Sequence, residues 1–178
     1  MLYAFGFETV GVVVGDLYFI DPHPEPGQEG PERGVRLEVR LLARQELHGS
    51  IYSAQPIVID QPVWRADLLE SVDAAPGSFD RTHHHPRFVG WEPGKREFEQ
   101  AMSGDPVAFV GAQLEDLPAL LERARLEPSS VPAADVDALR RTIPEILDTT
   151  RRLLDRVWAG ELARPPAETA DSARVGWL

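Results

Sequence analysis

The hydrophobic period of this chain of 178 residues changes once, and that change constrains the fold more than any other feature. Up to about residue 90, apolar residues alternate with polar ones, which is typical of strands with one buried face. Val35–Glu46 is the clearest case, because Val35, Leu37 and Val39 would face a core while the intervening charged residues would face solvent. From Asp105 onward the apolar residues recur at helical spacing instead. Strands followed by helices predict an α+β fold.

Turn-forming residues divide the alternating region into strands. We expect a two-residue turn at Gly15-Asp16, a long loop from Asp21 to Gly34 and a break at Asp60-Gln61-Pro62. The predicted sheet is therefore an antiparallel β-meander of five to seven strands. The C-terminal helices would cover one of its faces.

The helical region carries clear boundary signals. Asp105-Pro106 combines an N-cap acid with proline at the first helical position. Gly111 and Pro118 predict a division into two shorter helices, and Pro144 predicts a kink or a division of the last helix. We therefore expect one α+β domain over residues 1–163, with the sheet in 1–90 and the helical layer in 105–163. Residues 164–178, which end in Trp177-Leu178, would form a mobile C-terminal tail.

Composition narrows the classes of function. The chain has no cysteine, which excludes disulfides, thiolate metal sites and cysteine nucleophiles. Its net charge of −11 and its lack of a basic block disfavour nucleic acid as a partner. Because it shows neither a signal-peptide pattern nor a membrane-length apolar run, we expect a soluble cytoplasmic protein without a membrane partner.

Three of the five histidines lie together in the segment Asp80–Arg87. Pro86 favours an extended conformation for the residue before it. In a strand, His83 and His85 would share one face and His84 would point to the other. Neutral imidazole is a common metal ligand and also a general acid or base near neutral pH. The cluster is therefore the main candidate for a functional site.

The preceding strand-like segment, Val63–Glu70, carries Arg65 and Asp67 on one face. If an antiparallel register pairs Asp67 with His83, it also pairs Arg65 with His85, and all four side chains share a face. Asp67, His83 and His85 could then hold a divalent metal ion, the candidate cofactor. Alternatively Asp67 would orient a catalytic histidine while Arg65 stabilises an anion. The third interpretation is structural, with the histidines bonded to backbone groups and carboxylates.

Three further residues are candidates for ligand binding. Arg81 and Arg87 flank the histidines and would favour a small anionic ligand, and His23 lies in the long acidic loop that could close over them.

Two classes of function follow. The first is a small protein with a divalent-metal or hydrolase-like site in which Arg65, Asp67, His83 and His85 are catalytic. The second is a non-catalytic, acidic protein–protein interaction module or a self-associating subunit that forms a homo-oligomer. The net charge, the acidic loop and the apolar stripe of the last helix motivate the second class.

Overall fold

The computed structural model describes residues 1–24, 26–165 and 174–175. Its main sheet is antiparallel and follows chain order, so each of the first five strands pairs with its neighbours in sequence. A short sixth strand pairs with the second. The strands are β1 (Leu2–Gly6), β2 (Val10–Ile20), β3 (Pro31–Arg44), β4 (Ile57–Ser71), β5 (His83–His85) and β8 (Arg174–Val175). The predicted α+β meander is confirmed.

The helices follow β5 in sequence, as predicted, and β8 comes after them. They are α1 (Gln100–Gly104), α2 (Pro106–Glu115), α3 (Leu117–Arg123), a 3-10 turn (Pro128–Ser130) and α4 (Ala133–Trp158). Asp105 accepts a hydrogen bond from the Ala108 N–H, which confirms the predicted start of α2. Asp116 caps α3 in the same way, so the division falls just before Pro118. Pro144 lies inside α4 without dividing it.

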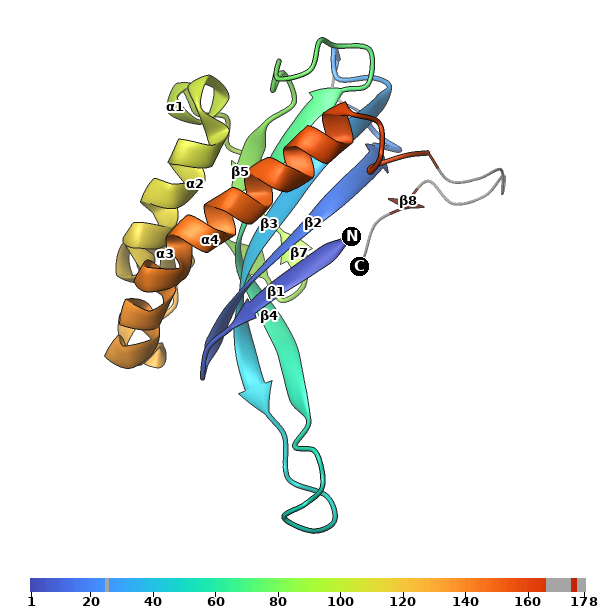
Figure 1. The fold of residues 1–178 in the computed structure, drawn as a ribbon. Helices are drawn as coiled ribbons and strands as arrows, with labels where there is room; N and C mark the ends of the chain where they lie inside the picture. The colour runs from blue at the N-terminus through green and yellow to red at the C-terminus, as the bar shows by residue number, and fades with distance from the viewer. Residues whose placement is uncertain (25, 166–173, 176–178) are drawn as a thin grey trace.

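One hydrophobic core joins the helices to one face of the sheet. Helix α4 crosses this face and contacts β2 and β3 (Figure 1). Val39 and Trp64 from the sheet and Leu114 and Ile146 from the helices are at most 1% exposed. The alternation in β3 and β4 sends every second side chain into this core. The residues between them point to the opposite face.

That opposite face is not the solvent-exposed surface that the sequence led us to expect. Glu38 is only 4% exposed there. The chain after β5 folds back over the face as a small hairpin, β6 (Phe88–Val89) and β7 (Glu92–Pro93). Phe88 lies against the Arg65 guanidinium. The charged side chains of β3 therefore lie between the sheet and this hairpin.

Two expected chain breaks are wrong. Strand β2 continues through Gly15-Asp16, because both residues pair with β3, and that long ladder provides more hydrogen bonds than a turn would. Strand β4 continues through Asp60-Gln61-Pro62, where register shifts opposite Arg40 absorb the irregularity as a bulge. The acidic loop is shorter than expected, since β3 already begins at Pro31. Of the predicted tail, residues 166–173 and 176–178 lie outside the described residues, so docking of Trp177-Leu178 stays a prediction.

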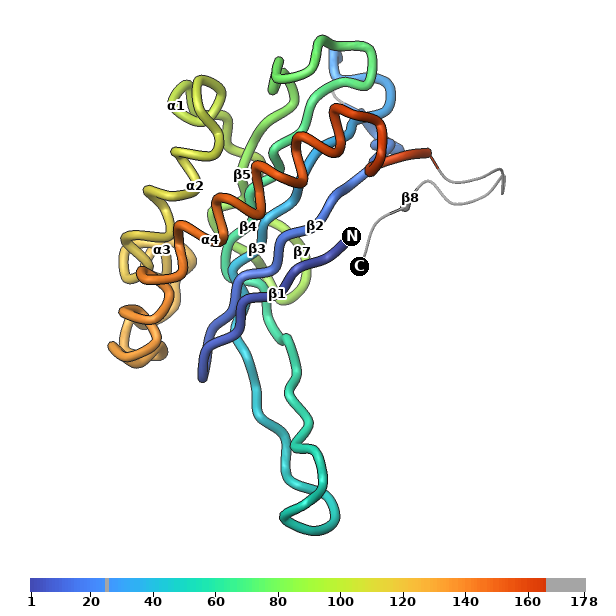
Figure 2. Tube along the Cα trace, in the orientation of Figure 1, coloured from blue at the N-terminus to red at the C-terminus, as the bar shows by residue number. Residues whose placement is uncertain are grey.

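The far ends of β3 and β4 form a two-stranded arm that projects from the body (Figure 2). The strands pair there from Leu42–Ile59 to Arg44–Ile57, and residues 45–56 connect them. Its apolar side chains that are more than 40% exposed are Leu47, Ile51, Tyr52, Ile57, Val58 and Ile59. No helix in the described part of the chain is long and apolar enough to cross a membrane.

Candidate functional site

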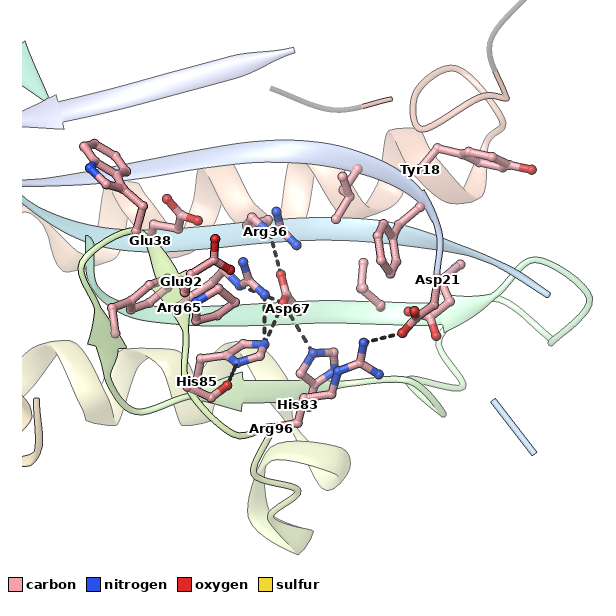
Figure 3. Close-up of a pocket in the computed structure, with 18 of the residues that line it drawn as sticks. Tyr18, Asp21, Arg36, Glu38, Arg65, Asp67, His83, His85, Glu92 and Arg96 are labelled. Atoms are coloured by element: carbon pink, nitrogen blue, oxygen red, sulfur yellow. Dashed lines mark hydrogen bonds and ion pairs between the residues drawn. The ribbon is translucent and has the colours of Figure 1, made fainter. Parts of the chain in front are cut away.

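The register between β4 and β5 brings the predicted constellation together. Asp67 pairs with His83, and Arg65 pairs with His85. All four side chains lie on the sheet face opposite α4, under the β6–β7 hairpin (Figure 3). This is the register on which the predicted cluster depended.

Asp67 is the buried centre of the cluster. Its side chain is 1% exposed and lies between two arginines. Arg36 donates from Nε to Oδ1 at 2.7 Å, and Arg65 Nε lies 2.9 Å from Oδ2. Burial alone would raise the pKa of Asp67, but the two arginine charges outweigh it and hold that pKa well below its usual range. Asp67 is therefore an ionised carboxylate at neutral pH.

Main-chain carbonyls orient the two site histidines. The Nδ1 atom of His83 lies 2.8 Å from the Arg81 oxygen, and that of His85 lies 2.8 Å from the Gly94 oxygen. A carbonyl oxygen only accepts, so Nδ1 carries the proton in both rings. The two Nε2 atoms consequently face Asp67 Oδ2, at 3.4 Å from His83 and 3.6 Å from His85. Hydrogen bonds of this kind orient metal-binding histidines in known sites.

A neutral ring at His85 directs its Nε2 lone pair toward the carboxylate. Burial is the largest influence on His85 and lowers its pKa, which favours the neutral ring. Arg65 donates from one terminal nitrogen to His85 Nε2 at 2.9 Å, which uses that lone pair in the present arrangement. Ligand atoms of Asp67, His83 and His85 lie within 4.8 Å of one another, so this buried cluster could hold a metal ion.

His84 belongs to the other face of the sheet and has the opposite tautomer. Its Nδ1 accepts a hydrogen bond from the Trp64 indole at 3.1 Å. A neutral ring then carries its proton on Nε2, which donates to Glu99 at 3.0 Å. His84, Glu97 and Glu99 also lie close enough together for a metal ion. However, the only ring atom of His84 that faces the carboxylates bears a proton, so we read His84 as a structural residue.

A pocket of about 630 Å³ opens over the cluster. Strands β2, β3, β4 and β5 form its floor, and the β6–β7 hairpin and the chain around Asp21 form its walls. Every arginine that lines it is paired with an acid. The pairs are Arg36–Asp67 at 2.7 Å, Arg40–Glu38 at 2.6 Å, Arg65–Asp67 at 2.9 Å and Arg96–Asp21 at 2.7 Å.

The three predicted ligand-binding residues do not line this pocket. His23 and Arg87 are exposed, and His23 donates its main-chain N–H to Asp21. The Arg81 guanidinium bonds to the Gly27 carbonyl at 2.6 Å. Arg81 contributes to the site through its own carbonyl, which holds the His83 ring.

Sequence reasoning missed several residues of the site. Arg36 and Glu38 come from the alternating row of β3, which the sequence led us to assign to solvent. The sequence did contain a signal for them. Both β3 and β4 carry charged residues at alternate positions, and pairing of two such strands places those charges side by side. Arg96 and Glu32 carried no such signal.

Comparison with protein-family models, with characterised proteins and with solved structures found no match to this chain.

Proposed function

We propose that the protein is a metal-dependent, hydrolase-like enzyme whose divalent ion is bound by Asp67, His83 and His85. One observation carries the proposal. Both histidines commit Nδ1–H to a main-chain carbonyl, which aims both Nε2 atoms at the same buried carboxylate oxygen. Two imidazoles and one carboxylate are a common ligand set that leaves coordination positions open for water and substrate.

The chemistry that such an ion supplies is activation of water and polarisation of a carbonyl or phosphoryl oxygen. The surrounding residues would have two tasks. Arg36 holds Asp67 Oδ1 and thereby leaves Oδ2 facing the histidines. Arg65 occupies the His85 lone pair and would have to turn away from it, which would free its guanidinium to bind a substrate oxygen.

The decisive experiment is metal content by mass spectrometry on untagged protein. Wild type should contain close to one equivalent of a divalent transition metal. The His83→Ala/His85→Ala double variant should contain less than about a tenth of that, because it keeps one of three ligands. His48→Ala is the matched control, since His48 is an exposed histidine outside the pocket.

Hydrolase activity is then assayed with the metal-loaded protein on ester, phosphoester and amide panels. A wild type that takes up no metal, even after dialysis against zinc, manganese or nickel, contradicts the proposal. Metal uptake that survives in the folded double variant contradicts it equally.

A specific observation also favours the second class of function, self-association. The arm over residues 42–59 exposes six large apolar side chains, with Ile51 84% and Tyr52 92% exposed. Clustered exposed apolar residues are typical of interaction sites. We propose that a second copy of this chain covers the arm. Sedimentation should give a dimer for wild type and a monomer for Ile51→Ser/Tyr52→Ser, and a monomeric wild type would reject this candidate.

A further inference from the structure

The pocket contains a buried acid that has no partner among the described residues. Glu32 lines the pocket and is only 3% exposed. Its Oε2 atom is buried and makes no hydrogen bond within the described part of the chain. An ionised group in such a place is costly unless an opposite charge or a hydrogen-bond donor compensates it. Glu32 therefore needs an explanation that the metal cluster does not give.

Other buried side-chain atoms that lack a hydrogen bond are different, because each faces an opposite charge. The pairs are Arg33 Nε with Glu70 Oε1 at 3.4 Å, Arg65 Nε with Asp67 Oδ2 at 2.9 Å and Arg81 Nε with Asp80 Oδ2 at 3.6 Å. Among the described residues, Glu32 takes part in no such ion pair.

Among the described residues that line the pocket, no positive charge is left for Glu32. Five carboxylates and four arginines line it. All four arginines are paired with acids other than Glu32. Arg96, for example, turns toward Asp21 (Figure 3). Burial is the largest influence on the pKa of Glu32 and raises it, although His83, Arg96 and Arg81 oppose the shift. The charges already present thus do not compensate the burial of this carboxylate.

Strand register places Glu32 at one end of the pocket floor, and the metal cluster lies further along the same strands. Glu32 precedes Arg36 by four residues on β3, a backbone distance of about 13 Å. Between them the floor is apolar. Gly34 has no side chain there, and its partners Leu17 and Leu69 line the pocket.

An aromatic side chain stands beside the acid. Phe19 pairs directly with Glu32 across β2 and β3, so the two side chains share a face, and both line the pocket. A carboxylate next to an aromatic ring is a favourable site for an organic cation, which gains both charge pairing and a cation–π contact.

We propose that Glu32 and Phe19 bind the ammonium group of an elongated ligand. An apolar spacer of this ligand would lie over Gly34, and its other end would reach Asp67, His83 and His85. Only the role of that far end rests on the proposed hydrolase function. The ammonium site itself follows from the unpaired acid, the ring and the charges of the pocket.

The probes are 1-hexylamine, a cation at neutral pH, and 1-hexanol, its neutral isostere. Binding is followed by NMR of the methyl groups of Leu17 and Leu69. Wild type should bind the amine about ten-fold more tightly than the alcohol, as expected for a buried charged hydrogen bond. Glu32→Gln should abolish this preference. Glu92→Gln is the matched control, since Glu92 is an exposed acid at the rim, and it should change the preference less than two-fold.

Equal binding of amine and alcohol by wild type, or no binding of the amine at millimolar concentration, overturns the inference. So does a preference that survives in folded Glu32→Gln. If Glu32→Gln does not fold, the preference of wild type for the amine over the alcohol still tests the site. Metal content is measured on the same samples and should be unchanged in Glu32→Gln. A metal-free wild type that still prefers the amine would reject the hydrolase proposal and keep this one.

Discussion

Arg36 and Asp67 face each other across β3 and β4, and the hydrogen bond from Arg36 Nε to Asp67 Oδ1 measures 2.7 Å. Asp67 is 1% exposed and Arg36 13% exposed, so the pair lies largely away from water. Removing one partner of such a pair leaves the other charge buried and uncompensated.

We therefore expect Arg36→Gln to lower the free energy of unfolding by about 3 kcal/mol. Arg44→Gln provides the comparison, because Arg44 is exposed and lies 3.9 Å from Glu8, and it should change stability by less than about 0.5 kcal/mol. Urea denaturation of both variants measures the difference. Equal stabilities would mean that Asp67 does not depend on Arg36.

Arg65 would compete with the proposed metal ion for the same lone pair on His85. Arg65→Gln removes a positive charge next to the proposed ion, and at about 4 Å such a repulsion amounts to a few kcal/mol at an effective dielectric of about 20. The variant should bind zinc at least about ten-fold more tightly than wild type, while its metal-free form unfolds at a lower temperature. Competition with a fluorescent chelator measures the affinity. Weaker zinc binding in the variant would mean that Arg65 supports the ion instead.

Glu32 should make stability depend on pH. Its pKa is raised in the folded protein, chiefly by burial, so the folded state favours the protonated form. The stabilising contribution is complete below the unfolded pKa and is lost as the pH rises through the folded pKa. Glu32→Gln should therefore be more stable than wild type at pH 7, and the difference should vanish near pH 4. His83, Arg81, Arg96 and Asp67 act on the same carboxyl. Thermal unfolding of wild type and Glu32→Gln between pH 4 and pH 7 tests this prediction. A Glu32→Gln variant that is less stable than wild type at pH 7 would refute it.

Gly34 is required by the close approach of β3 to β4. A Cβ atom at this position would lie 2.0 Å from the Leu68 carbonyl oxygen, so the strands would have to separate. We expect Gly34→Ala to destabilise the fold by about 2–3 kcal/mol and to weaken metal binding at the proposed site through a shift of Asp67. Gly104→Ala is the control, because nothing lies within 4 Å of the added methyl group. A wild-type melting temperature for Gly34→Ala would disprove this constraint.

Periodicity was enough to predict the architecture and half of the site. The alternating segments Val35–Glu46 and Val63–Glu70 coincide largely with β3 and β4, and the capping pair Asp105-Pro106 marks the start of α2. Pairing of Asp67 with His83 followed from that alternation once a register was assumed. Local turn signals failed at Gly15-Asp16, because long-range pairing with β3 provided more hydrogen bonds than the local turn.

The rest of the site depended on a segment without regular pattern. Residues 86–96 fold back over the sheet, so a face that was expected to contact solvent becomes the floor of a pocket. Nothing in their composition indicates which face they would cover. Arg36 and Glu32 were therefore assigned to solvent or to a loop, although both are part of the pocket.

Strand β5 is three residues long, and its side chains alternate between the pocket and the core. On the core side, His84 accepts a hydrogen bond from Trp64. On the pocket side, His83 and His85 face Asp67. Inserting or deleting one residue beside this strand would exchange the two sets and leave neither with its partners. Natural variation within β5 should thus proceed by substitution, because a change in its length would exchange the histidines that face the pocket and the core.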